Sequence, residues 1–61
     1  AAKKRAQEVV DQLTESIANY EKTAAKFAAS GNSKKSDEAT ESAAARRVWL
    51  AEAEKGLAEF N

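Results

Sequence analysis

The most constraining feature of this sequence is a heptad repeat of apolar residues in its first half. Seven positions recur at alternating intervals of four and three residues: Ala6, Val10, Leu13, Ile17, Tyr20, Ala24 and Phe27. This spacing places all seven on one stripe of an α-helix, and a stripe sustained over three heptads is typical of a surface that packs against another helix. The pattern predicts a first helix over about residues 3–30.

The second half of the chain repeats the same spacing, with one charged member. Its stripe consists of Ala39, Ala43, Arg46, Leu50, Ala53, Leu57 and Phe60. It predicts a second helix over about residues 36–60, after a turn over about residues 31–35. Gly31 suits the left-handed conformation that closes a helix. Ser36 is the expected N-cap of the second helix, and three acids are expected to follow it in the first turn: Asp37, Glu38 and Glu41.

A connection of about five residues favours antiparallel neighbours. Folding the chain back about position 33 pairs residues whose numbers add up to about 66. The predicted layers are Phe27 with Ala39, Ala24 with Ala43, Tyr20 with Arg46, Ile17 with Leu50, Leu13 with Ala53, Val10 with Leu57 and Ala6 with Phe60. Large side chains meet small ones in three of these layers, as interdigitated packing requires. We also expect Arg46 to stack on Tyr20, and Glu21 to pair with Arg47.

The sequence therefore predicts an all-α fold, an antiparallel, coiled-coil-like helical hairpin that occupies residues 1–61 as one unit. The alternative is a continuous helix that pairs between chains, because Gly in a helix interior costs only about 1 kcal/mol. A chain of 61 residues is marginal as an isolated domain. It has no Cys and no His, so we expect its support to come from self-association into a four-helix bundle or from docking on a partner.

The residue types argue against catalysis and against cofactor binding. Without Cys or His, the common pairs of nucleophile and base are missing, and we expect no enzyme activity and no cofactor. The acids Asp37, Glu38 and Glu41 are chemically able to chelate a hard cation, but acids at a helix start are explained by the helix dipole, so we predict no metal site. Basic and acidic residues number 10 each, which signals no strongly charged partner.

Several features of the chain bear on its location and origin. No apolar run approaches the about 20 residues that cross a bilayer, and no signal peptide is recognisable. The chain does not begin with Met, which we interpret as a processed product or an excised fragment. None of these features indicates a compartment.

One side of the predicted seam is free of charge, and we call it the uncharged flank. Its members recur every seven residues beside the seam: Val9, Ser16 and Thr23 on the first helix, and Ser42, Trp49 and Gly56 on the second. Trp49 is the only Trp, and no predicted neighbour is large enough to cover its indole. We expect the ring to stay partly exposed and to centre a partner interface. The alternative is that Trp49 folds over Ser16 and closes the edge of the seam.

The opposite side carries Glu21, Arg47 and Glu54, and beyond them lies a stripe of alanines. This stripe consists of Ala18, Ala25, Ala44, Ala51 and Ala58. It is explained equally by close helix approach and by filling exposed positions with a good helix former.

The sequence supports two classes of function unequally. The leading hypothesis is a structural or protein–protein interaction module that binds itself or another helical protein. The alternative is a small nucleic-acid-binding hairpin that uses a basic face of Lys22, Lys26, Arg46 and Arg47. Acidic residues are interspersed with these cations, whereas phosphate binding normally requires a net basic face, so we rank this alternative second.

Overall fold

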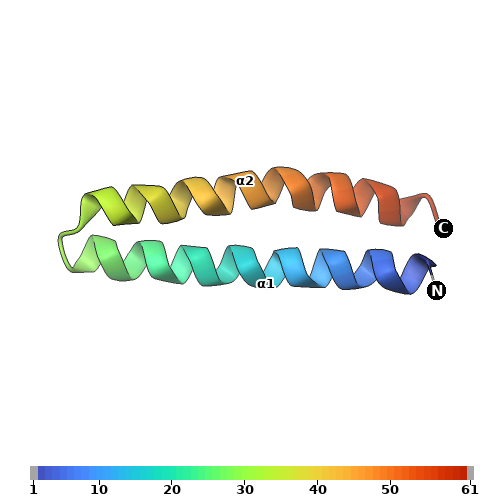
Figure 1. Ribbon diagram of the computed structural model, residues 1–61, viewed down its shortest axis with the longest axis horizontal. Helices are drawn as coiled ribbons and strands as arrows, with labels where there is room; N and C mark the ends of the chain where they lie inside the picture. Colours follow the sequence, from blue (N-terminus) through green and yellow to red (C-terminus); the bar gives the residue numbers. More distant parts are fainter. Residues whose placement is uncertain (1, 61) are drawn as a thin grey trace.

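The computed structural model describes residues 2–60 and shows two antiparallel helices lying side by side (Figure 1). Helix α1 spans Ala2–Ala29 and helix α2 spans Ser33–Ala58. The residues described contain no strand. The hairpin measures 45 × 14 × 11 Å, with both termini at the end opposite the turn. The predicted all-α hairpin is confirmed.

Helix α1 ends in the conformation that the sequence predicts at Gly31. This residue has a φ of 81°, in the left-handed region that glycine adopts without a steric penalty. The Gly31 N–H donates to the carbonyl of Ala28 at 3.2 Å, and the Asn32 N–H donates to the carbonyl of Phe27 at 2.8 Å. These two bonds form a Schellman motif, which satisfies carbonyls left without partners at the helix end.

Helix α2 begins three residues earlier than predicted, because Asn32 caps it. The Asn32 side-chain oxygen accepts a hydrogen bond from the Lys35 N–H at 3.2 Å. Asn is as good an N-cap as Ser, and the earlier start adds helical bonds such as that from the Ser36 N–H to the Asn32 carbonyl at 3.0 Å. The prediction of Ser36 as N-cap was therefore wrong. A single residue, Asn32, completes the end of α1 and begins α2.

Ser36 instead joins the seam between the helices. Its hydroxyl donates to the carbonyl of Ala24 at 3.0 Å, which fastens the first turn of α2 to α1. The earlier start of α2 also displaces the acids expected in its first turn. Asp37, Glu38 and Glu41 all lie beyond that turn, which contains no acidic residue.

The two predicted stripes form the contact between the helices. All seven residues of the first stripe are buried or half-buried, and so are six of the seven in the second. The exception is Phe60, which is 50% exposed because α2 has already ended at Ala58. The most deeply buried side chains are those of Ile17, Ala39 and Ala43.

The two specific contacts predicted across the seam are both present. The Arg46 guanidinium lies 4.4 Å from the centre of the Tyr20 ring. Arg47 forms an ion pair with Glu21. Both partners of this ion pair are about half exposed, so it contributes only about 0.2–1 kcal/mol. These contacts confirm the predicted alignment of the helices in the middle of the hairpin.

The hairpin leaves more surface in water than a compact protein of its mass. Its accessible surface is 4541 Å² for 6.6 kDa, whereas monomeric proteins of this mass expose about 3,900 Å². Its radius of gyration is 14.0 Å, against about 10.5 Å for a compact chain of this length. Two helices without a third layer therefore bury little apolar surface.

Candidate interaction surface

The uncharged flank is the better covered of the two sides of the seam. Its serines, Ser16 and Ser42, and its glycine, Gly56, are half-buried, while Val9, Thr23 and Trp49 are exposed. On the opposite side, the corresponding residues on both helices are all exposed: Gln7, Thr14, Glu21, Ala28, Thr40, Arg47 and Glu54. The small residues of the uncharged flank thus lie close to the seam and are partly covered. Its larger side chains project into the solvent.

Trp49 is 53% exposed, so the predicted partial exposure of the indole is confirmed. No neighbour covers the ring, as predicted, but one side chain contacts it that the heptad spacing did not predict. The Arg46 guanidinium lies 5.3 Å from the Trp49 ring centre, and it also contacts Tyr20. The same guanidinium donates to the Ser42 carbonyl at 3.1 Å. Arg46 therefore holds its charge between two aromatic rings, which fixes its position beside Trp49.

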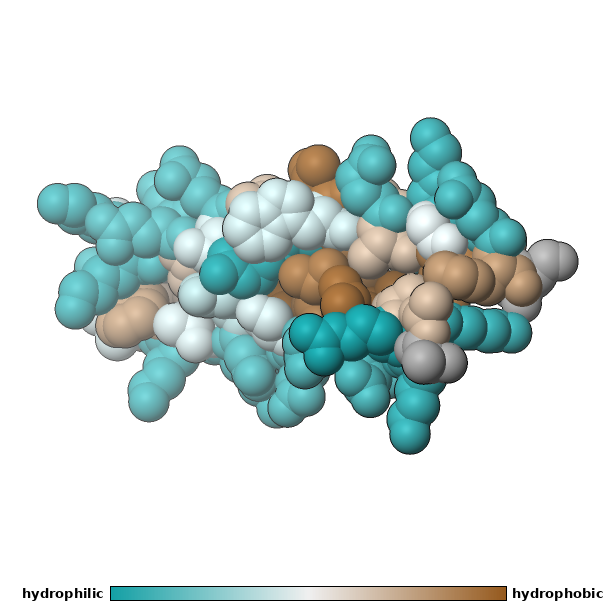
Figure 2. All heavy atoms as spheres, turned by 45° about the vertical axis from the view of Figure 1, so that its right-hand side comes forward, coloured by the Kyte–Doolittle hydropathy of each residue, from teal (hydrophilic) through white to brown (hydrophobic). Residues whose placement is uncertain are grey.

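Two other apolar side chains are exposed, Val48 directly beside Trp49 in the chain and Val9 farther toward the termini. Val48 is 63% exposed and Val9 is 38% exposed. In Figure 2, pale and brown surface runs along one face of the hairpin between borders of charged side chains. Val48 was not among the predicted interface residues, because it lies on the side of α2 that faces away from the seam. The sequence feature that could have indicated Val48 is its position directly before Trp49 in the chain.

At the turn end the flank is bounded by Lys35. The Lys35 ammonium lies 5.4 Å from the centre of the Phe27 ring, which the turn leaves half-buried. This contact was not predicted, because the predicted turn over residues 31–35 included Lys35, which lies in α2.

The four residues of the predicted basic face do not form one continuous set of available cations. Arg46 is held between the Tyr20 and Trp49 rings, and Arg47 pairs with Glu21 on the opposite side of the seam. Lys22 and Lys26 are exposed and lie one turn apart on α1. Two of the four cations are thus already engaged by residues of the same chain.

The acids considered for cation binding do not converge. Within residues 2–60 no group of three or more acidic side chains is close enough to hold a metal ion, and this includes Asp37, Glu38 and Glu41. No polar or charged side chain described by the structure is buried. The chemistry that this surface offers is contact with another apolar surface rather than coordination.

Neither a protein family, nor a curated protein, nor a solved structure matches this chain. Neither α1 nor α2 contains an apolar stretch of the length that crossing a membrane requires.

Proposed function

We propose that this chain is a non-catalytic interaction module that acts in assembly, by packing its uncharged flank against helices of a protein partner. The observation that carries the proposal is the exposure of Trp49. This residue lies at the middle of the flank with 53% of its surface exposed to solvent. Binding hot spots are enriched in tryptophan, tyrosine and arginine, and here Trp49 lies beside the Arg46 guanidinium. A partner that covered it would remove a large apolar area from water.

The small size of the core supports the same proposal. Among the residues described, only Ile17, Ala39 and Ala43 are buried apolar side chains, and two of these are alanines. Small domains commonly gain their missing stability from oligomerisation or from a partner. Nucleic-acid binding has less support, because Arg46 and Arg47 already contact aromatic and acidic groups of the same chain.

Trp49 fluorescence tests the proposal directly. In a dilute monomeric sample we expect red-shifted emission that soluble quenchers reach, with a blue shift when a partner covers the ring. Blue-shifted, quencher-protected emission in a demonstrably monomeric sample would contradict the proposal, because the ring would then be covered by its own chain.

Two matched variants separate the flank from the rest of the exposed apolar surface. Trp49→Ala should weaken association about 30-fold or more, the effect of losing a hot spot of about 2 kcal/mol. Val48→Ala removes a side chain that is more exposed, at 63%, but that lies outside the flank. It should change association less than about threefold. Both variants should keep the helical circular dichroism signal of the parent chain.

A further inference from the structure

We propose that the partner is a second copy of this chain, docked flank to flank so that α1 of each copy lies on α2 of the other. This inference rests on the proposed function and deepens it. It is carried by the charges that border the uncharged flank, which have opposite signs on the two helices.

The bordering residues form one row on each helix, directly outside the uncharged flank. The outer row of α1 is Arg5, Gln12, Asn19 and Lys26, and the outer row of α2 is Glu38, Ala45, Glu52 and Glu59. All eight residues are exposed. The row on α1 contains no acid, and the row on α2 contains no base. Each flank is thus bordered by positive charge along one helix and by negative charge along the other.

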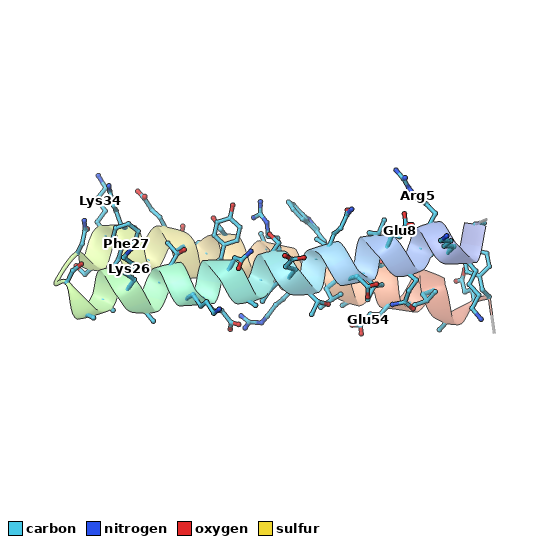
Figure 3. The ribbon with its side chains drawn as sticks, turned by 90° about the horizontal axis from the view of Figure 1, so that it is seen from below. Arg5, Glu8, Lys26, Phe27, Lys34 and Glu54 are labelled. Carbon is cyan, nitrogen blue, oxygen red and sulfur yellow. The ribbon has the colours of Figure 1, made fainter. Side chains whose placement is uncertain are left out.

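Within one hairpin these two rows cannot neutralise each other, because they lie on the far sides of the two helices with the seam between them. The ion pair that the structure shows within residues 2–60 joins Arg47 and Glu21. Neither residue belongs to an outer row, and both lie on the opposite side of the seam. In Figure 3, Arg5 projects from one side of the hairpin and Glu54 from the other. Arg5 belongs to the outer row of α1, and Glu54 lies on the side that carries the ion pair. The charges of both outer rows are therefore available to a second molecule.

The antiparallel alignment determines which charges would meet. The contact of Tyr20 with Arg46 shows that residues whose numbers add up to about 66 lie at the same level. A two-fold axis parallel to the helices preserves this level when α1 of one copy lies on α2 of the other. Arg5 then meets Glu59 of the second copy, and Lys26 meets Glu38. The polar pair of Gln12 and Glu52 lies between them.

The next row outward repeats this complementarity. It places Glu8 at the level of Lys55 of the second copy, and Lys22 at the level of Glu41. Two adjacent rows thus pair opposite charges in four places and like charges in none. Complementary charges of this kind select the partner and its orientation more than they add to affinity.

The reverse arrangement is disfavoured by the same rows. A two-fold axis perpendicular to the helices would place α1 on α1 and α2 on α2. Arg5 would then meet Lys26 of the second copy, and Glu38 would meet Glu59. Like charges that face each other across an interface are destabilising and suppress that pairing.

The favoured arrangement also accommodates the tryptophan. Trp49 lies at the level of Ser16, so the indole of each copy would cover Ser16 of the other, between Val9 and Thr23. These side chains are small or slender and leave room for a ring. Ser42 and Gly56 on the same row as Trp49 let the helices approach closely. By symmetry both indoles would be buried.

The dimensions of the flank suit a stable dimer. The face is about 45 Å long and 14 Å wide, on the order of 600 Å² in projection before side-chain relief is counted. Stable protein interfaces bury about 800 Å² on each partner. The pairing would convert two hairpins with small cores into a four-helix bundle with a shared core.

Orientation is tested with a single spin label, because the chain contains no Cys of its own. Ser33→Cys places the label at the turn end of each copy, at an exposed position away from the flank. With helices spaced about 8–10 Å apart, the proposed dimer places both labels at the same end of the bundle, so the label-to-label distance should be far shorter than the hairpin. The reverse arrangement would separate the labels by about the 45 Å length of the hairpin.

A charge swap tests the pairing of the rows. One variant carries Glu38→Lys and Glu59→Lys, and the other carries Arg5→Glu and Lys26→Glu. Each variant alone should self-associate at least about tenfold more weakly than the parent, because each interface then holds like charges. An equimolar mixture should recover the parent affinity, since every pair is again opposite in sign.

A control of equal net charge separates specific pairing from general attraction. Asp11→Lys with Glu54→Lys adds the same charge as the first variant but places it away from the two outer rows. Its mixture with the second variant should not recover the parent affinity, because the altered α1 row then meets an unaltered, acidic α2 row.

The outcomes distinguish this inference from the proposed function. A dimer with the long label distance, or a charge-swap mixture that fails to recover, would overturn the proposed pairing while leaving the flank as an interface. A chain that stays monomeric up to millimolar concentration with exposed Trp49 would overturn the second copy as partner. Only protection of Trp49 in the monomer would overturn both.

Discussion

Ile17→Ala is the substitution that most directly tests the account of the core. Ile17 is the only large side chain among the residues described that is buried, with 6% of its surface exposed. Truncation to Ala removes three carbon atoms, which corresponds to about 2.4 kcal/mol of transfer free energy at about 0.8 kcal/mol each. Adding the cavity that remains, we expect a loss of about 3 kcal/mol. In a chain of 61 residues, the core supplies only about 3–5 kcal/mol of stability.

The assay is urea unfolding followed by helical circular dichroism, at one fixed chain concentration because association adds stability. We expect Ile17→Ala to be largely unfolded without urea, or to unfold with a midpoint at a much lower urea concentration than the parent chain. The matched control is Val48→Ala, which removes a β-branched side chain that is 63% exposed and should change stability by less than about 0.5 kcal/mol. Equal midpoints for the two variants would refute the assignment of Ile17 to the core and, with it, the predicted seam.

Three further predictions concern the turn and the seam. Gly31→Ala should destabilise the hairpin by about 1 kcal/mol, because Gly31 has a φ of 81°, whereas Gly56→Ala should stabilise the isolated chain by a similar amount, because a Cβ at this helical position meets no atom within 4 Å; equal effects in thermal unfolding would contradict the assigned turn. Asn32→Ala should cost about 0.5–2 kcal/mol in the same measurement and Asn32→Ser only a few tenths, and equal losses would mean that the side-chain cap contributes nothing. Arg46→Leu should change the stability of the monomer by less than about 1 kcal/mol, because the cation–π contacts it loses are offset by apolar contact with the seam; a loss above about 2 kcal/mol would reveal a buried interaction of Arg46.

Most of the candidate interaction surface follows from heptad arithmetic. Rows of residues seven apart lie along one side of a helix, so the uncharged flank and the partial exposure of Trp49 were predictable from spacing alone. Contacts made by long side chains were predictable only in part. The stacking of Arg46 on Tyr20 follows from their facing positions, but its second contact with Trp49 depends on a rotamer that spacing does not specify.

The start of α2 was mispredicted because two good capping residues compete there. Asn32 and Ser36 have similar N-cap preferences, and each is followed by residues that form helices readily. The way in which α1 ends determines which of the two residues caps α2. Once the Schellman motif places Asn32 directly after Gly31, its side chain already lies at the start of α2, and Ser36 is left to bond across to Ala24.

The sequence by itself determined the two helices, the seam between them, the left-handed residue of the turn and the uncharged flank, because each of these depends on local conformation or on helical periodicity. Only the tertiary structure decided how deeply each seam residue is buried. Ile17 is buried while Leu50, its predicted partner, is half-exposed, and Phe60 lies beyond the last turn of α2. Burial depends on how closely the other helix approaches at that level. This approach is set jointly by the side chains of both helices, and no single stripe of the sequence specifies it.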